Sequence, residues 1–230
     1  MKNHLKRIAS PRTWILDKKY SKYTVKPNPG AHALDSGLPL GVILRDILKI
    51  ADSMTEVKKI LNSKEVLVDG RRRKDHRFQV GLFDVLSIPD LKQNYRIVLD
   101  VKGRLSVLEI ESKESSIKIC KINGKTVLSK GKIQFNLSDG KNIISDMQAK
   151  LGDSLVVSLP EFKVKEVLPL KAGAVVCIVK GKQSGSLGTI KELKKKEVVF
   201  SSKNKAVETE TTKNCLFVLG FNEPKIKVEL

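Results

Sequence analysis

The sequence is poor in residues that build metal sites and disulfide frameworks. Its three cysteines, Cys120, Cys177 and Cys215, lie far apart and form no C-x-x-C pair. Structural zinc sites and disulfide-stapled domains need closely spaced or numerous cysteines. The sequence therefore predicts no metal site and no disulfide framework, and it favours a reducing compartment.

Long apolar stretches are also missing. The longest apolar run, Ala172 to Val179 with one glycine inside, is far shorter than the roughly 20 residues that cross a bilayer. The N-terminus carries positive charge but has no apolar segment behind it, so it does not have the pattern of a signal peptide. We expect a cytoplasmic protein that has no membrane partner.

Residue patterns for catalysis are scarce as well. The chain has three histidines, His4, His32 and His76, and none pairs with a serine or cysteine and an acid at a recognisable spacing. The glycine-rich stretch after Val179 lacks the GK[ST] ending of a nucleotide-binding loop. The sequence predicts neither an enzyme nor a cofactor, and no small-molecule substrate.

Acidic residues are few in comparison with basic ones. The chain has 44 Lys and Arg against 25 Asp and Glu, a net charge of +19. The excess is spread along the whole chain. A protein that neutralises phosphates gains affinity from the release of counterions, so such an excess favours a nucleic acid as partner. The alternatives are a basic soluble protein without such a partner and a protein that contacts acidic membrane surfaces.

Residues 1–38 resemble an extended basic arm. Their cations are interleaved with Trp14, Tyr20 and Tyr23, and prolines prevent long regular structure. We expect the arm to order on a phosphate-rich surface, with its aromatic rings stacking on bases or packing on the protein. The alternative is an ordinary flexible terminus, against which the single tryptophan argues.

Residues 39–92 predict a compact RNA-binding module. Apolar residues at helical spacing over 39–62 indicate two short helices, and Ser53 to Glu56 has the pattern of a capping box. Asp69-Gly70 then predicts a hairpin turn from which four consecutive cations emerge. Such a cluster would meet phosphates as one patch. The alternative is a solvated basic strand edge.

The remainder predicts β-structure. Apolar runs and turns such as Asn123-Gly124 and Asp139-Gly140 indicate a meander or small barrel from about residue 95 to 168. Another β unit covers 171–203, and its glycine-rich loop lets the backbone approach a partner closely. The fold class is α+β, β-rich and multidomain.

Several segments, taken in order, resemble the ribosomal protein S4e family of the small subunit of archaeal and eukaryotic ribosomes. The segments that carry the resemblance are His4-Leu5-Lys6-Arg7, Pro11 to Lys18, Leu38-Pro39-Leu40, Leu44-Arg45-Asp46, Val68-Asp69-Gly70-Arg71, Tyr95-Arg96, Asp100-Val101-Lys102-Gly103-Arg104, and Gly173, Gly181, Gly185 and Gly188-Thr189-Ile190. They extend over nearly the whole chain.

The resemblance implies a basic arm (1–38), an S4-type helical RNA-binding domain (39–92), a central β domain (93–170) and a KOW domain, which is an SH3-like barrel, with a C-terminal tail (171–230). It implies a structural constituent of the small ribosomal subunit that functions in translation, with small-subunit rRNA and neighbouring ribosomal proteins as partners. Because eukaryotic members usually continue beyond the position of Leu230, an archaeal-type member is expected.

From the charges and motifs together we predict a set of residues that contact RNA. They are Lys2, His4, Lys6, Arg7, Arg12, Trp14, Lys18, Lys19, Lys22, Arg45, Lys49, Arg71, Arg72, Arg73, Lys74, Arg77, Lys180, Lys182, Gly185 and Ser186.

Two rival functions have specific sequence support. S4-type domains also precede pseudouridine synthases, whose catalytic aspartate lies in a G-R-L-D segment; here Gly103-Arg104-Leu105 is followed by Ser106, which cannot supply the carboxylate. A KOW-bearing transcription or translation factor is the other rival, and the arm and S4-type domain argue against it.

Overall fold

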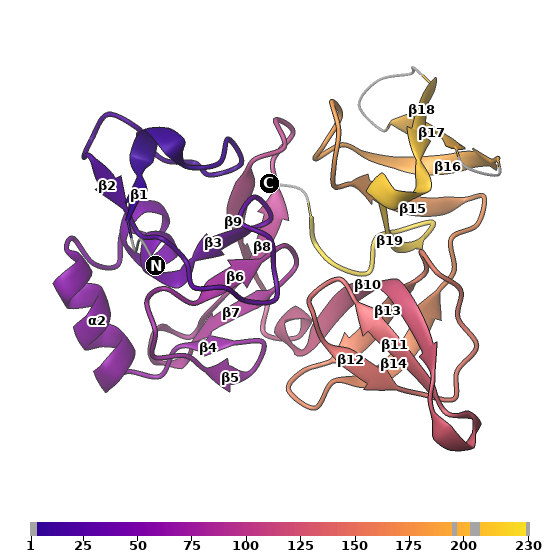
Figure 1. The fold of residues 1–230 in the computed structure, drawn as a ribbon, viewed down its shortest axis with the longest axis horizontal. Helices are drawn as coiled ribbons and strands as arrows, with labels where there is room; N and C mark the ends of the chain where they lie inside the picture. Colours follow the sequence, from indigo (N-terminus) through magenta and orange to yellow (C-terminus); the bar gives the residue numbers. More distant parts are fainter. Residues whose placement is uncertain (1–3, 195–196, 203–207, 229–230) are drawn as a thin grey trace. The chain divides into compact units, whose positions relative to one another are not determined.

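The structure, a computed structural model, describes residues 4–194, 197–202 and 208–228. It divides into two compact units (Figure 1). Unit 1 consists of Met1–Val98 and Arg104–Ser115, and unit 2 of Leu99–Gly103 and Ser116–Leu230. The chain therefore passes from one unit to the other three times.

The N-terminal arm is folded onto unit 1. Strand β1 (Leu5–Lys6) pairs with β2 (Tyr23–Thr24), and a 3-10 turn (Arg7–Ala9) follows β1. Further along, Trp14 forms a parallel bridge with Leu105 and is 2% exposed. The expectation of an arm that stays extended until RNA orders it is wrong, because its large apolar side chain is buried in the rest of unit 1.

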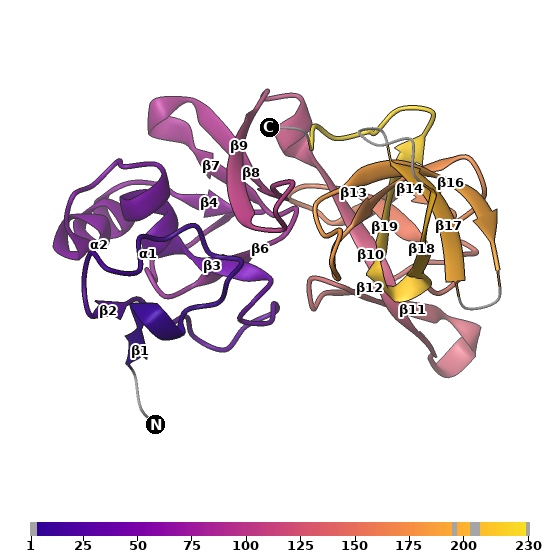
Figure 2. The same cartoon turned by 90° about the horizontal axis from the view of Figure 1, so that it is seen from above.

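The helical part of unit 1 follows the arm. Strand β3 (Gly37–Pro39) leads into α1 (Leu40–Val42) and a π-helical turn (Ile43–Ile47), and α2 spans Met54–Ser63. The Ser53 hydroxyl accepts a hydrogen bond from the Glu56 amide, and the Glu56 carboxylate accepts one from Ser53, which confirms the predicted capping box. In Figure 2 the helices lie on one side of unit 1 and β7 to β9 on the other.

A five-stranded sheet forms the other half of unit 1, in the order β5-β4-β7-β8-β9. A two-stranded ladder joins β3 to β6. The strands are β4 (Leu67–Val68), β5 (Arg71–Arg72), β6 (Gln79–Gly81), β7 (Val85–Ile88), β8 (Gln93–Leu99) and β9 (Leu105–Ile110). Since β8 pairs with β7 over its first four residues, the predicted domain boundary at 92/93 lies inside this sheet and is corrected.

The β4–β5 turn matches its prediction. Asp69 and Gly70 both have positive φ, 52° and 73°, as a two-residue hairpin turn requires. Beneath the sheet and helices, Leu44, Leu61 and Leu86 have no exposed surface and form part of the core of unit 1.

Unit 2 contains two antiparallel five-stranded sheets. The first has the order β12-β11-β10-β13-β14 and packs around Phe135, Leu155 and Val157. Its strands are β10 (Ile117–Val127), β11 (Ile133–Leu137), β12 (Asn142–Ile144), β13 (Ser154–Ser158) and β14 (Lys163–Leu168). The second has the order β18-β17-β16-β15-β19, with β15 (Ala174–Ile178), β16 (Leu187–Leu193), β17 (Glu197–Ser202), β18 (Glu208–Thr212) and β19 (Leu216–Phe221).

A buried lysine ties the two sheets of unit 2 together. Lys121, on β10, donates through Nζ to the carbonyl oxygens of Lys213, Asn214 and Leu216 at 3.1, 2.9 and 2.8 Å. Burial lowers the pKa of Lys121 to about 8. The predicted boundary at 170/171 falls between the two sheets, after β14 and before β15, although both sheets belong to one unit.

Two kinds of feature are missing from the described residues. No helix among them is long and apolar enough to cross a membrane. Within the same residues, no group of three or more His, Cys, Asp or Glu side chains could hold a metal ion.

Candidate nucleic-acid interface

Arg7 of the arm lies inside the protein. Its Nη2 donates to Asp46 Oδ1 at 2.9 Å and its Nη1 to the Asp17 carbonyl at 2.8 Å, while the guanidinium carbon is 5.4 Å from the centre of the Tyr20 ring. The side chain is 2% exposed. The assignment of Arg7 as an RNA contact is corrected, because its charge is already compensated by a carboxylate of the same chain.

Trp14 is buried too. Its indole N–H donates to the Leu34 carbonyl at 3.2 Å, and the backbone beside it is held by Leu105, whose amide donates to the Thr13 carbonyl at 2.7 Å. Of the two roles left open for the arm's aromatic rings, Trp14 therefore packs on the protein. Its assignment as an RNA contact is corrected.

Other arm cations remain at the surface. Lys6, Arg12, Lys19 and Lys22 are exposed, and we call them the arm surface. His4 is exposed beside them and lies tilted against the Tyr23 ring at 5.5 Å. Lys18 is half-buried and donates to the Ser10 carbonyl at 3.2 Å. Lys2 lies outside the described residues.

The β4–β5 hairpin presents the cations that the sequence placed there. Arg71, Arg72 and Lys74 are exposed. Arg73 is half-buried, with its guanidinium 4.2 Å from the centre of the Phe78 ring. Arg72 also donates to the carbonyls of Asn62 and Lys64 at 3.1 and 3.3 Å, so it stabilises the C-terminal end of α2 as well.

Helix α2 adds cations that the sequence reading missed. Lys58 and Lys59 are exposed on the face opposite the buried Val57 and Leu61, and Lys64 follows the helix. Burial and the charge of Lys58 lower the pKa of His76, which places Lys58 near the chain that leaves the hairpin. Helical periodicity was the signal: once Val57 and Leu61 face the core, Lys58 and Lys59 must face outward. The hairpin surface is thus Lys58, Lys59, Lys64, Arg71, Arg72 and Lys74.

The remaining predicted cations of unit 1 are partly engaged. Arg45 is half-buried and donates to Asp46 Oδ2 at 2.8 Å, and Arg77 donates to the Lys26 carbonyl at 3.0 Å. Lys49 is exposed at the edge of a groove of about 440 Å³ that Tyr20 also lines. Three carboxylates share this groove, which makes it a poor site for phosphate.

The β15–β16 loop of unit 2 carries exposed Lys180 and Lys182, while Ser186 is half-buried. Gly185 has φ of 89°, and a Cβ there would lie 1.9 Å from the Asp100 carbonyl oxygen. Its expected role of letting the backbone approach a partner is corrected, since it approaches the chain's own backbone. The same packing brings Gly103 against Ser184, so exposed Lys102 lies beside this loop and was missed. Lys102, Lys180 and Lys182 form the loop surface.

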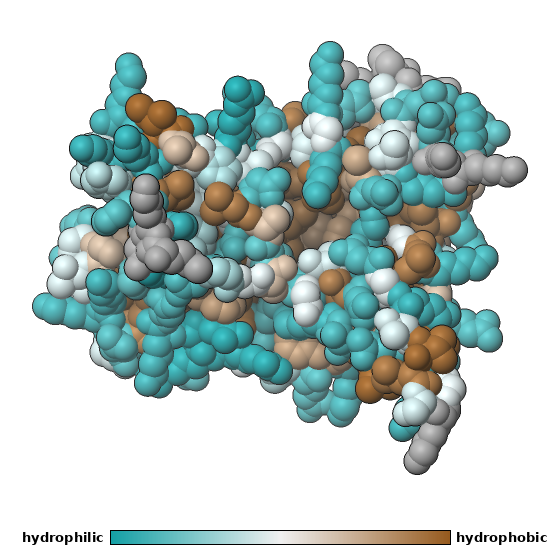
Figure 3. Space-filling model, in the orientation of Figure 1, coloured by the Kyte–Doolittle hydropathy of each residue, from teal (hydrophilic) through white to brown (hydrophobic). Residues whose placement is uncertain are grey.

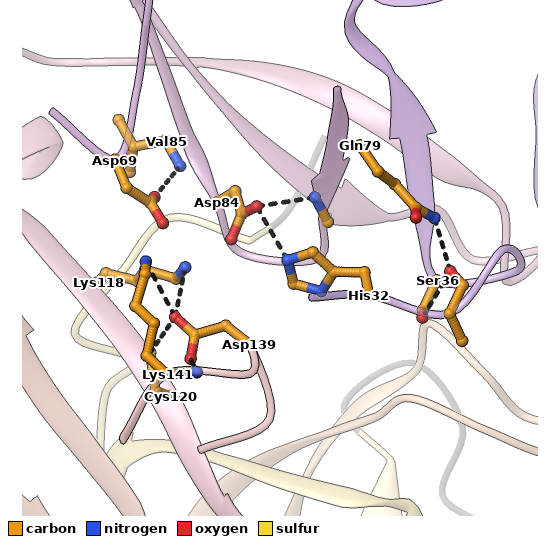
Figure 4. A network of polar contacts seen from close by, with 12 residues as sticks. His32, Ser36, Asp69, Gln79, Asp84, Val85, Lys118, Cys120, Asp139 and Lys141 are labelled. Atoms are coloured by element: carbon orange, nitrogen blue, oxygen red, sulfur yellow. Dashed lines mark hydrogen bonds and ion pairs between the residues drawn. The ribbon is translucent and has the colours of Figure 1, made fainter. Parts of the chain in front are cut away.

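Figure 4 shows polar groups that hold the fold rather than face a partner. The His32 imidazole points at Asp84, with Nε2 and Oδ2 3.0 Å apart, and Asp84 also accepts from the Gly81 amide at 2.8 Å. This pair attaches the end of the arm to β6. In unit 2, Lys118 donates to Asp139 at 2.9 Å, and both side chains are almost fully buried. These groups serve as buried structural pairs.

Two family models match the sequence. Residues 1–35 match the RS4NT (NUC023) domain, and residues 91–164 match the ribosomal family S4e. The first match covers the arm, and the second begins just before β8 and ends inside β14. Together they point to the family whose motifs the sequence resembles.

Whole-length relatives agree. The chain is 44% identical over 231 residues to small ribosomal subunit protein eS4 of Methanocella arvoryzae, covering 98% of this chain and 97% of the relative. Identity to the eS4 protein of Methanocaldococcus jannaschii is 41% over 240 residues, with 99% and 98% covered. The crystal structure of 30S ribosomal protein S4e from Thermoplasma acidophilum matches with a TM-score of 0.70 at 30% identity, over 82% of this chain and 97% of that one. The chain belongs to the S4e family of small-subunit ribosomal proteins as an archaeal-type member, and this family consists of structural proteins and not of enzymes.

Proposed function

We propose that this chain binds small-subunit rRNA through the arm, hairpin and loop surfaces, and so serves as a structural constituent of the small subunit in translation. The hairpin surface carries the proposal. Its cations stand on a short helix and a tight hairpin, both fixed by local structure. Arg71 and Arg72 are exposed in β5, and Lys74 is exposed just after it. A fixed cluster of this kind binds a backbone of phosphates without reading bases.

The finer domain assignments belong to the same proposal. A helical pair followed by the β4–β5 hairpin has the element order of an S4-type RNA-binding domain, and β15 to β19 have the size and antiparallel order of a small KOW-type barrel. The loop surface would then be the RNA-facing end of that barrel. Neighbouring proteins of the small subunit are the remaining partners, and cytoplasmic ribosomes are the location.

The salt dependence of binding tests the hairpin surface. Full-length protein carrying Arg71→Gln and Lys74→Gln is titrated with small-subunit rRNA between low and high salt. Each phosphate contact contributes about 0.7–0.9 to the slope of log K against log salt, so the double variant is expected to lower the slope by about 1.4–1.8.

The matched control replaces two exposed lysines of β14, Lys163→Gln and Lys165→Gln. It removes the same charge from a strand that has no place in the proposed surfaces. An equal drop in slope for both pairs would mean that total charge, and not the hairpin, sets the affinity, and would overturn the assignment.

Sedimentation tests the place in the subunit. A tagged copy in cell extract is expected to comigrate with the small subunit at low and at high salt, as a structural constituent would. A salt-labile or free pool would instead support the rival of a transiently bound factor.

A further inference from the structure

Unit 2 contains a groove of about 660 Å³ that none of the proposed RNA surfaces uses. Its floor is aliphatic and includes Ile133, Val167 and Leu170. The lining comes from β10, from the start of β11, from the residues before β13, and from the end of β14 with the residues that follow it. Grooves of this size with apolar floors are typical of binding sites.

Three lysines stand around the groove. Lys125, Lys150 and Lys171 line it and are exposed, and among the residues that the structure describes none of the three forms an ion pair with a carboxylate. The one acidic residue of the lining, Asp153, is 5% exposed. Its two carboxylate oxygens accept hydrogen bonds from the amides of Lys150 and Leu170, each at 2.8 Å. The rim therefore presents uncompensated positive charge around an apolar floor.

Apolar side chains continue beyond the groove. Met147 and Leu151 flank its 148–150 wall and are 39% and 63% exposed, and Val127, two residues from Lys125, is 71% exposed. Figure 3 shows hydrophobic residues gathered at the surface where the β10–β11 hairpin extends from unit 2. An apolar patch of this kind with a charged rim is characteristic of protein-binding sites.

The composition of the lining argues against a site for unpaired RNA bases. Unpaired bases are held by stacking on aromatic rings or arginine planes, and none of the ten lining residues is aromatic or arginine. The Phe135 ring, whose centre lies 5.8 Å from Lys125 Nζ, has no exposed surface. The aliphatic floor and the lysine rim of the groove instead complement a peptide that carries apolar side chains and carboxylates.

We propose that this groove binds an acidic, apolar segment of another protein. The apolar side chains of the segment enter the groove, and its Asp or Glu side chains pair with Lys125, Lys150 and Lys171. Only the source of the segment, a neighbouring protein of the small subunit, rests on the proposed function.

Photo-crosslinking in assembled subunits gives the direct test. Full-length protein with p-benzoylphenylalanine in place of Leu151 is expressed in cells, and small subunits are purified and irradiated. A crosslink to a protein stretch rich in Asp or Glu and in aliphatic residues is expected. The same label in place of Lys163, also exposed on unit 2, is the matched control and should not give that product. A crosslink from position 151 to RNA, or none beyond the control, overturns the proposal.

A binding measurement with the purified full-length chain keeps the test independent of assembly. The probe is a fluorescent ten-residue peptide of alternating Leu and Glu. The control peptide has the same length and alternates Leu and Lys. The Lys125→Gln, Lys150→Gln, Lys171→Gln variant is expected to weaken binding of the acidic probe at least tenfold, whereas Lys163→Gln with Lys165→Gln leaves it unchanged.

Equal binding of both peptides, or equal loss in both variants, would refute the groove as an acidic-peptide site. Tighter binding of an oligouridylate than of the acidic probe would assign the groove to RNA. The rRNA titration of the hairpin variant tests the proposed function, and the peptide measurement tests the groove. The two can fail independently, because the groove lysines and the hairpin cations lie in different units.

Discussion

The arm and the β4–β5 hairpin are both strongly basic, yet their charged residues do different work. In the arm, Arg7 is buried against Asp46 and Trp14 is part of the core of unit 1. In the hairpin, Arg71 and Lys74 remain exposed on a turn that is fixed by Asp69 and Gly70. Cationic sequence alone therefore does not separate a binding surface from an internal structural contact. The two regions differ in exposure: Arg7 and Trp14 are each 2% exposed, whereas Arg71 and Lys74 lie at the surface.

The sharpest test of this contrast is Trp14→Ala against Arg71→Ala. Truncating a buried tryptophan costs about 3–5 kcal/mol, whereas exposed substitutions stay within about 0.5 kcal/mol. Urea unfolding of the full chain followed by circular dichroism measures both. Equal midpoints for the two variants would mean that the arm is not part of the core.

Arg7→Met should cause the next largest loss of folding stability. Removing one partner of a buried ion pair costs about 3–5 kcal/mol, and the lower end applies here because Asp46 keeps its contact with Arg45 at 2.8 Å. Arg12→Met, an exposed change in the same arm, is the control and should leave the urea midpoint unchanged. A small loss for Arg7→Met would show that the arm is held by Trp14 alone.

Two glycines of the β15–β16 loop differ in the same way, since Gly185 packs against the chain itself and Gly181 faces open space. Gly185→Ala meets both a positive φ and the Asp100 carbonyl, while Gly181→Ala meets a positive φ of 103° in open space. Strain alone costs about 1–2 kcal/mol, and overpacking adds about 1–3 kcal/mol at Gly185 only. In thermal unfolding, the melting temperature should therefore fall from the wild type to Gly181→Ala and fall further to Gly185→Ala. Equal losses for the two variants would contradict the close approach of Gly185 to the Asp100 carbonyl.

Burial of Lys121 predicts the smallest and most specific effect, a dependence of the free energy of unfolding on pH. Its pKa is about 8 in the folded chain, below the 10.5 of an exposed lysine, because burial disfavours the charged form. Between these values the unfolded chain binds more protons, so the free energy of unfolding rises with pH from about 8 towards 10.5. The buried Cys177 thiol, with a pKa raised to about 12, acts in the opposite direction above about 9.

Comparison with Lys121→Met isolates this contribution, since Cys177 titrates identically in both proteins. The wild type is expected to gain stability relative to the variant between pH 8 and 10. A constant difference across that range would show that the pKa of Lys121 is not lowered.

Features encoded by neighbouring residues were predictable. The capping box at Ser53 and the positive-φ turn at Asp69-Gly70 depend on contacts within four residues, and both follow from sequence. The family resemblance, carried by ordered motifs, is confirmed by relatives of 40% identity or more. The exposure of Lys58 and Lys59 also follows from helical periodicity, although the two residues are missing from the set predicted from the sequence.

Long-range pairings were not predictable in the same way. Arg7 meets Asp46 across 39 residues, and nothing in the local pattern selects that carboxylate. The boundary at 92/93 failed because β8 has the composition of any buried strand, and only its register with β7 shows to which sheet it belongs. Gly185 looked like a binding-loop glycine for a similar reason, since its neighbour, Asp100, lies 85 positions earlier in the chain.

The three passages of the chain between the units impose an order on synthesis at the ribosome. All of unit 1 has been made once residue 115 is translated, so it is able to fold while unit 2 is still incomplete. Leu99–Gly103, which emerges before that point, acquires its contacts with Ser184 and Gly185 only when those two residues have been made. That delay spans roughly 80 residues of translation, or about 4–16 s at usual elongation rates. During that interval the nascent chain displays Lys102 of this turn before the loop that packs on it exists.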